Sequence, residues 1–294
     1  MEIFGIPSQA LFGQLLIGLI NGSFYALLSL GLAVIFGLLN IINFTHGAQY
    51  MLGAFVAYLG LTKLGLNYWV SLLVTPLVVG ASGMLIERTM LKQLYKLDHL
   101  YGLLLTFGLA LIIQGLFRNE FGSSGMPYPA PEIFQGAFNL GFMFLPKYRA
   151  WVIVASLVVC ISTWYVIERT KLGGYLRAAT ENPSLVQAFG INVPRMITLT
   201  YGFGVALAAL AGVMAAPIYQ VNPTMGADLI IVVFAVVVIG GMGSIMGSIL
   251  TGLGLGIVEG LTRVFYPEAS SIVVFVVMVI VLMFRPAGLF GKEA

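Results

Sequence analysis

Charged side chains are scarce in this 294-residue chain: they make up 9% of it, whereas 60% of the residues are hydrophobic. The mean hydropathy is +1.01. Soluble domains carry about 25% charged residues, so this composition excludes an ordinary soluble domain. The long apolar runs also lack the alternation that a membrane β-barrel needs. We therefore expect an all-α protein, a polytopic transmembrane bundle with discontinuous helices.

Residue types that carry catalysis or bind metal ions are equally rare. The chain has two histidines and one cysteine, Cys160, which excludes an intrachain disulfide. No His, Cys, Asp or Glu set has metal-ligand spacing, and no serine lies in a G-x-S-x-G motif. The phosphate-binding motif G-x-x-x-x-G-K-[ST] is missing, so we expect no ATP hydrolysis by this chain. We predict that it is not an enzyme and binds no cofactor, metal ion or nucleic acid.

Nine segments are apolar enough to form membrane-spanning helices. A bilayer core of about 30 Å needs roughly 20 apolar residues in a helix. The first segment is too long for one simple span and the seventh is short, so the expected number is nine, within a range of 8–10. The segments are 10–39, 47–63, 69–87, 100–117, 150–168, 197–216, 228–242, 244–262 and 271–285.

Basic residues divide unevenly between the two sides that nine spans define. Nine of the 14 fall on one side, after residue 87, in or beside residues 169–196 and at the C-terminus; five fall on the other. Lysine and arginine accumulate in cytoplasmic loops. We therefore predict that residues 169–196 and the C-terminus are cytoplasmic and that the N-terminus is external.

The segment 118–149 is then a long external loop. It holds Pro127, Pro129, Pro131 and Pro146. Prolines favour irregular structure, and we expect short re-entrant pieces here. The loop is either a lid packed on the outer surface or a docking site for a partner.

Polar side chains mark the first two apolar segments. Asn21-Gly22 predicts a break in the first segment, and NFTHG predicts a corner between helices, capped by Asn43 or Thr45. For His46 we expect a structural cap, whereas Asn40 belongs to the same polar group as Asn43. Polar groups in hydrocarbon must be satisfied by protein or by a water-filled cavity.

Neutral amides and hydroxyls suit a pathway that must bind a small polar solute without holding it tightly. Broken helices often line such pathways. The alternative, which the sequence leaves open, is that these groups form hydrogen bonds between helices and only fix the packing. The predicted pathway residues are Asn21, Tyr25, Asn43 and Gln49, with Thr106 and Gln114 as weaker candidates.

Glycines gather late in the chain. Gly243 and Gly247 lie in a dense cluster, and Gly252, Gly256 and Gly260 follow at four-residue spacing, which places them on one helix face. Small residues at that spacing let helix backbones approach closely in lipid. The partner of this face is either a helix of the same chain or a second membrane subunit. We also expect an i,i+4 ion pair between Glu259 and Arg263.

The polar segment 169–196 predicts two short helices, broken at Asn182-Pro183. Asn182 suits the cap of a helix that starts at Pro183, and Gly190 suits a left-handed stop. Leu185, Val186, Ala188 and Phe189 give the second helix an apolar side. A helix this short is unstable alone and needs a groove to lie in. That groove belongs either to another protein or to the chain's own membrane domain.

The segment ATENPSLVQAFGINVPR resembles the cytoplasmic coupling loop of ABC importer permeases. With NGSFYALLSLGLAVIFGLLNIINFTHG, VVFAVVVIGGMGSIMGSILTG and FRPAGLFG, the chain resembles permeases of the high-affinity branched-chain amino acid family, the LivH type, over essentially its whole length. The resemblance implies one permease domain, 1–294, that forms half of a translocation pore. It also implies that ATPase coupling falls to Ala179, Glu181, Asn182, Pro183, Leu185, Ala188, Phe189 and Gly190.

The same resemblance implies partners and a location. They are a second, paralogous LivM-type permease, two cytoplasmic ATPases that bind ATP and magnesium, and a periplasmic or lipid-anchored solute-binding protein, in the bacterial inner membrane. The substrates implied are branched-chain or related amino acids, with urea, short amides or aromatic acids as alternatives. A rival class is the stand-alone ion-coupled carrier, which buries ionisable residues in its spans. Here Asp228 only begins a span and Glu259 only ends one.

Overall fold

All nine expected segments form helices. The computed structural model describes residues 2–3, 6–39, 42–95 and 97–291, so Asn40, Lys96 and Lys292 lie outside the described residues. The all-α expectation is confirmed. The helices are α1 (Ser8–Leu39), α2 (Thr45–Leu64), α3 (Tyr68–Thr89), α4 (His99–Phe121), α5 (Lys147–Arg169), α8 (Val193–Tyr219), α9 (Ala227–Gly240), α10 (Ile245–Phe265) and α11 (Val273–Phe284).

Not every one of these helices is long enough to cross a bilayer. Within the described residues, six are long and apolar enough: α1, α3, α4, α5, α8 and α10. The apolar helices α9 and α11 have 14 and 12 residues. At about 1.5 Å per residue both fall short of a core of about 30 Å. The number of spans therefore stays a prediction.

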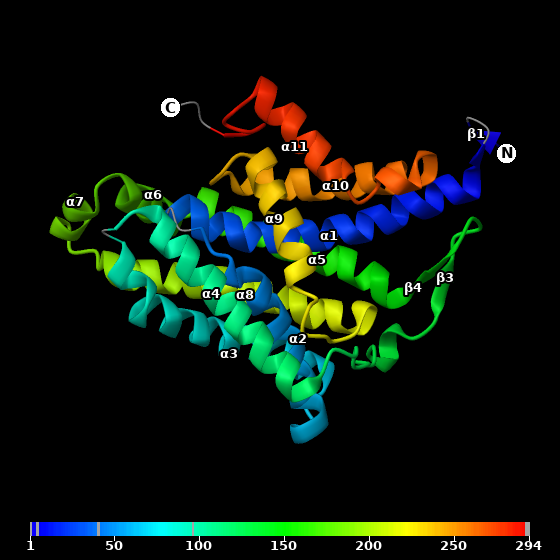
Figure 1. The fold of residues 1–294 in the computed structure, drawn as a ribbon, viewed down its shortest axis with the longest axis horizontal. Helices are drawn as coiled ribbons and strands as arrows, with labels where there is room; N and C mark the ends of the chain where they lie inside the picture. The colour runs from blue at the N-terminus through cyan, green and yellow to red at the C-terminus, as the bar shows by residue number, and fades with distance from the viewer. Residues whose placement is uncertain (1, 4–5, 40–41, 96, 292–294) are drawn as a thin grey trace.

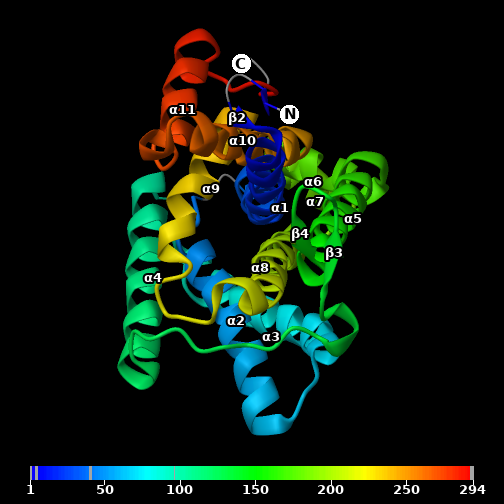
Figure 2. The ribbon, with the colours of Figure 1, turned by 90° about the vertical axis from the view of Figure 1, so that its right-hand side faces the viewer.

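Helices α1, α5, α8 and α10 run along the longest axis of the molecule and separate two different ends (Figure 1). At one end lie the strands β3 (Ala137–Asn139) and β4 (Phe144–Pro146), together with β1 (Glu2–Ile3) and β2 (Ile6–Pro7). At the other end lie α6 (Lys171–Glu181) and α7 (Pro183–Ala188), which form the helical hairpin. Figure 2 looks along this axis, and α1 and α8 are seen end-on. We call these the strand end and the hairpin end.

Helices α1 and α10 pack backbone against backbone. A Cβ atom added at Gly256 would lie 2.3 Å from the carbonyl oxygen of Gly18, and one added at Gly260 would lie 2.5 Å from that of Gln14. At Gly252 the nearest atom would be the Cα of Ala26, 2.6 Å away. No side chain fits at these distances. This contact, the α1–α10 seam, shows that the predicted glycine face packs within the chain, and that a second subunit is not its partner.

The two other glycines of the cluster do not belong to the seam. Gly243 lies in the turn between α9 and α10 with a φ of +87°, and it approaches the backbone of Gly37. Gly247 instead lies against Gly240 of α9, whose carbonyl oxygen would be 2.2 Å from an added Cβ. These glycines set the tight turn that joins α9 to α10.

The predicted break at Asn21-Gly22 is wrong. Helix α1 continues from Ser8 to Leu39 without interruption. A helix in lipid must satisfy its own backbone, which favours continuity. Gly22 serves the seam instead, because an added Cβ would lie 3.0 Å from the carbonyl oxygen of Leu253.

The predicted corner between the first two helices does exist, with α2 starting at Thr45. Asn43 Oδ1 accepts a hydrogen bond from the Thr45 N–H at 3.1 Å, but Phe44 occupies the N-cap position of α2 and makes no side-chain cap bond, so neither Asn43 nor Thr45 is the predicted cap. His46 does not act as a cap. Its ring is buried, and Nε2 lies 3.0 Å from the carbonyl oxygen of Leu28, so it ties α2 to α1.

The segment 118–149 contains a 3-10 turn, η2 (Glu132–Phe134), and the β3–β4 hairpin rather than re-entrant pieces. Gly141, with a φ of +81°, makes the hairpin turn possible. Met126 pairs with Val221 through two backbone hydrogen bonds of 2.8 and 2.9 Å. The segment is therefore fastened to the connection between α8 and α9.

The seam makes a prediction with a matched control on the same helix. Gly256→Ala places a methyl group against the backbone of α1, whereas at Gly254 an added Cβ meets nothing within 4 Å. We expect Gly256→Ala to lower stability by about 1–3 kcal/mol through overpacking. Gly254→Ala should be neutral or stabilising, because alanine favours a helix by about 1 kcal/mol over glycine. Thermal unfolding in detergent measures both, and equal melting temperatures would contradict the packing described.

Candidate functional site

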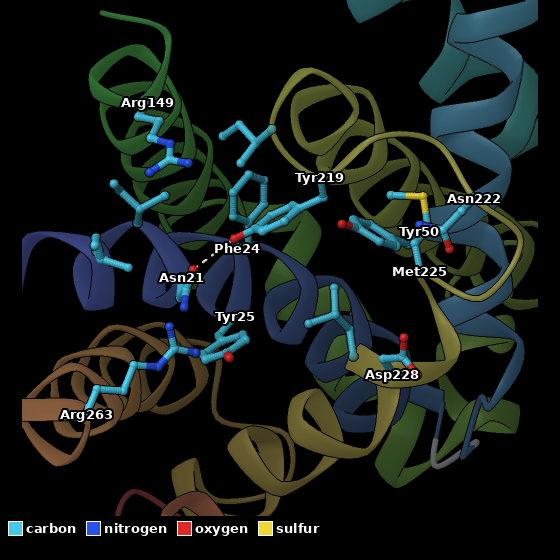
Figure 3. A pocket seen from close by; sticks show the side chains of 14 residues that line it. Asn21, Phe24, Tyr25, Tyr50, Arg149, Tyr219, Asn222, Met225, Asp228 and Arg263 are labelled. Carbon is cyan, nitrogen blue, oxygen red and sulfur yellow. Dashed lines mark hydrogen bonds between the residues drawn. The ribbon is translucent and has the colours of Figure 1, made fainter. Parts of the chain in front are cut away.

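A polar cavity of about 480 Å³ lies among helices drawn from the whole chain (Figure 3). Its walls come from the first half of α1, the start of α5, the end of α8, the start of α9 and the end of α10, and α5 starts directly after β4. The cavity therefore belongs to the strand end. Its polar lining residues are Asn21, Tyr25, Tyr50, Arg149, Tyr219, Asn222, Asp228 and Arg263.

Two hydrogen-bonded pairs order one wall of the cavity. The Tyr219 hydroxyl donates to Asn21 Oδ1 at 2.8 Å, which joins the end of α8 to α1. The Tyr25 hydroxyl donates to the Glu259 carboxylate at 2.7 Å. Glu259 also pairs with Arg263, so the predicted i,i+4 ion pair is confirmed. The seam holds α1 and α10 close enough for the contact between Tyr25 and Glu259.

Tyr50 of α2 brings an unsatisfied hydroxyl to the cavity. Its side chain is only 1% exposed, and among the described residues its hydroxyl has no hydrogen-bond partner. In Figure 3 the hydroxyl points toward the cavity. A buried polar group without a partner costs about 1–3 kcal/mol. A solute or a water molecule in the cavity would satisfy it.

The structure places two of the six predicted pathway residues, Asn21 and Tyr25, on this cavity. Asn43 and Gln49 hydrogen-bond to each other at 3.2 Å, at the corner between α1 and α2. The Thr106 hydroxyl, from α4, donates to the Ile42 carbonyl and accepts from the Phe44 N–H, both at 3.2 Å. These three side chains hold α4 to the corner.

Gln114 lies apart from the other five, on a second cavity of about 300 Å³ between α2, α4 and α9. That cavity is lined mainly by apolar side chains, among them Met51, Phe107 and Ile230. A pathway role for Asn43, Gln49, Thr106 and Gln114 stays a prediction.

Six polar lining residues escaped the sequence interpretation: Tyr50, Arg149, Tyr219, Asn222, Asp228 and Arg263. Five of them lie at helix ends or in a connection, where polar residues are common and do not indicate a site. One signal was present, because these ends fall on the same side when nine spans are counted. Tyr50 gave no such signal, since a tyrosine within an apolar segment has the pattern of a core residue.

At the hairpin end, the predicted local structure of α7 is confirmed. Asn182 Oδ1 accepts hydrogen bonds from the Leu185 N–H at 3.0 Å and the Ser184 hydroxyl at 2.8 Å. Pro183 is at the start of α7, and Gly190 has a φ of +84°. Proline at this position lacks only an N–H that would be unpaired, and glycine adopts positive φ without strain.

The apolar residues of α7 divide between two directions. Val186 is buried and packs with Ala179 and Val193 inside the hairpin. Leu185 and Phe189 are 54% and 78% exposed, and Ala188 is exposed as well. Of the other predicted coupling residues, Glu181, Asn182, Pro183 and Gly190 are exposed. The exposed residues belong to α7 and its two ends, whereas Ala179 of α6 is buried.

A buried carboxylate joins three elements near this hairpin. Glu87 of α3 is 1% exposed and accepts hydrogen bonds from the Tyr95 hydroxyl at 2.5 Å and the Thr198 hydroxyl of α8 at 2.6 Å. Burial, and then the hydrogen bond to Glu87, raise the pKa of Tyr95 above its usual range. Tyr95 also borders a cavity of about 430 Å³ with Glu181 and Ile197. This junction was not predictable from the sequence, because Glu87 lies at the end of an apolar segment, where a charged residue is expected.

A helical bundle whose described residues include six helices of bilayer length, with a polar cavity shared by distant segments, has the features of a multi-pass membrane transport protein. The model of the family described as the branched-chain amino acid transport system / permease component matches residues 14–282. The chain belongs to this family, and it is a transport permease subunit.

Individual relatives extend over the same length. The chain is 31% identical over 292 residues to the branched-chain amino acid permease protein BraD of Pseudomonas aeruginosa, and 30% identical over 296 residues to LivH of Escherichia coli, with 95% of each chain covered in both cases. It is 29% identical over 293 residues to LivM of Escherichia coli, and this match covers 90% of this chain and 67% of LivM. No solved structure matches.

Two asparagines separate the pathway role from the packing role. Asn21 lines the cavity, whereas Asn43 is 1% exposed and bonded at the corner. We expect Asn21→Ala to change uptake or substrate preference with little loss of stability. Asn43→Ala should lower stability by about 1–3 kcal/mol, because it leaves buried partners unpaired. Both are measured in the reconstituted complex, and an Asn21→Ala variant that loses stability but keeps its selectivity would contradict the assignment.

Proposed function

We propose that the chain forms half of the translocation pore of an ATP-driven importer for branched-chain or closely related amino acids. The observation that carries the proposal is the difference between the two ends of the molecule. A polar cavity lies at the strand end, and an exposed, capped helix lies at the hairpin end. Family membership and the names of BraD and LivH support the substrate class. The alternatives are urea, short amides and aromatic acids.

The energy comes from two separate ATPase subunits that bind ATP and magnesium. The chain has no phosphate-binding loop of its own. Leu185 and Phe189 offer apolar side chains on a helix of six residues, which needs a groove for stability. The side of α7 that packs on the chain's own hairpin is a different one, around Val186. This division favours docking on a partner over packing on the membrane domain.

A second permease of the LivM type completes the pore. The relatives include both LivH and LivM proteins, which indicates that two paralogous chains of this family exist side by side. A periplasmic or lipid-anchored binding protein delivers the solute at the strand end, where residues 118–149 cover the connection between α8 and α9. These residues therefore serve as its docking surface.

The membrane is the bacterial inner membrane, with the hairpin end in the cytoplasm. Lys171 and Arg177 lie in α6, and Arg88 and Lys92 precede Tyr95, which borders the same cavity as the hairpin. Arg149 and Arg263 instead line the cavity at the strand end. The richer group of basic residues thus gathers at the hairpin end, as cytoplasmic segments do. The N-terminal helix then starts outside.

Gly190 tests the coupling role of the hairpin. Its φ of +84° is strained for a β-branched residue. Gly190→Val should distort the end of α7 and uncouple ATP hydrolysis from uptake, while the protein still inserts. Gly174→Ala is the control, since this exposed helical glycine has nothing within 4 Å of an added Cβ. ATPase activity and uptake are measured together in proteoliposomes; normal coupling in Gly190→Val would argue against the proposed role.

Orientation is tested by labelling. Cys160 is buried, so the native chain is a suitable background for a single exposed cysteine. Ser184→Cys in α7 should resist an impermeant thiol reagent in intact cells and react after permeabilisation. Ser123→Cys, in the exposed connection after α4, should react in intact cells. The reverse pattern would show that the orientation is wrong.

A further inference from the structure

The cavity at the strand end holds charges of both signs on opposite walls. Arg149 from α5 and Arg263 from α10 lie on either side of Asn21, and Asp228 from α9 lies across the cavity (Figure 3). Among the described side chains, neither Arg149 nor Asp228 forms an ion pair. Opposite charges that line one cavity and remain unpaired are available to a ligand.

The guanidinium groups keep donors for that ligand. Arg263 pairs with Glu259 through Nη2, and its side chain is still 40% exposed. A guanidinium has five N–H donors in a planar fork that suits a carboxylate. Arg149 and Arg263 together therefore make one wall of the cavity a carboxylate-binding surface, with the Asn21 amide between them.

The charges around the cavity sum to zero. Arg149 and Arg263 are positive, while Asp228 and the Glu259 that pairs with Arg263 are negative. An anion such as an aromatic acid would be repelled by the carboxylate of Asp228. A neutral amide or urea would leave the charges of Arg149 and Asp228 without an ionic partner. A molecule with a carboxylate at one end and an ammonium at the other satisfies both walls without adding net charge.

Apolar side chains complete the cavity. Ile17, Ile20, Phe24, Ile218 and Leu229 line it beside the charged groups. Such side chains exclude a polar substituent and accept a branched aliphatic one, since burying each methylene contributes about 0.8 kcal/mol. The Tyr50 hydroxyl, which is buried and has no hydrogen-bond partner among the residues that the structure describes, is directed at the same space.

We propose that this cavity binds an α-amino acid as its zwitterion, with Arg149 and Arg263 on the carboxylate, Asp228 on the ammonium group and the Tyr50 hydroxyl as a further hydrogen-bond partner. The proposal rests on the proposed function and adds the residues that select the substrate in the membrane. It separates an amino acid from the amide, urea and aromatic-acid alternatives by charge alone.

The test removes one charge at a time from the protein, by substitution, and the opposite charge from the probe, by the choice of analogue. The importer is reconstituted with its partners, and the permease–ATPase complex is also prepared without binding protein. The probes are leucine, leucinamide, which lacks the carboxylate, and 4-methylpentanoate, which lacks the ammonium group. The variants are Arg149→Gln, Asp228→Asn and Tyr50→Phe. Lys63→Gln and Glu268→Gln are controls, because both residues are exposed, neither lines the cavity, and both lie outside residues 118–149.

We expect leucine to stabilise the wild-type complex against heat at a lower concentration than either analogue. Arg149→Gln should abolish the preference for leucine over leucinamide, and Asp228→Asn the preference over 4-methylpentanoate. Each should raise the KM of leucine uptake about tenfold, and Tyr50→Phe about threefold, whereas both controls keep wild-type values. Asp228→Glu should restore most of the preference.

The outcomes separate this inference from the proposed function. If the wild-type importer takes up leucine while Arg149→Gln and Asp228→Asn keep both the KM and the preferences, the zwitterion site is wrong and the importer assignment stands. If the assembled wild-type importer moves no amino acid, the proposed function itself fails. Loss of preference in a complex that melts at the wild-type temperature excludes a purely structural role for these charges.

Discussion

The close contact of α1 with α10 is the constraint on which the rest of the molecule depends. Water does not drive helices together in lipid, so they associate through fine packing, which small residues permit. Here three glycines of α10 meet the backbone of α1. This places Tyr25 against Glu259 and brings Arg263 to the cavity. The geometry of the polar site therefore depends on a contact between two helix backbones at which α10 has only glycines.

Much of the fold was accessible from the sequence because lipid imposes simple rules. Apolar length predicted all nine helices, and glycine and asparagine chemistry predicted both ends of α7. The site was less accessible, because it depends on which helix ends meet in space. Arg149, Asp228 and Arg263 are far apart in sequence, and only the packing of α5, α9 and α10 brings them to one cavity.

The ambiguities of the sequence share one physical cause. A polar side chain in an apolar segment has two uses, to line a cavity or to bond to another helix, and the sequence does not distinguish between them. Asn43 and Gln49 bond to each other, whereas Asn21 faces the cavity. Gly22 presents the same ambiguity, since glycine serves both a helix break and a close approach. In each case the role of the residue depends on which residue it contacts, and that contact comes from a distant part of the chain.

The continuity of α1 links the two faces of the molecule. With 32 residues it is about 48 Å long, more than the thickness of the hydrocarbon core. Near its start Phe12 stacks obliquely with Phe142, in the turn of the strand hairpin, and near its end Gly37 borders the cavity beside the helical hairpin. A broken helix would absorb a displacement at the break. An unbroken helix moves as one rigid body, so a displacement at one of its ends also displaces the other end.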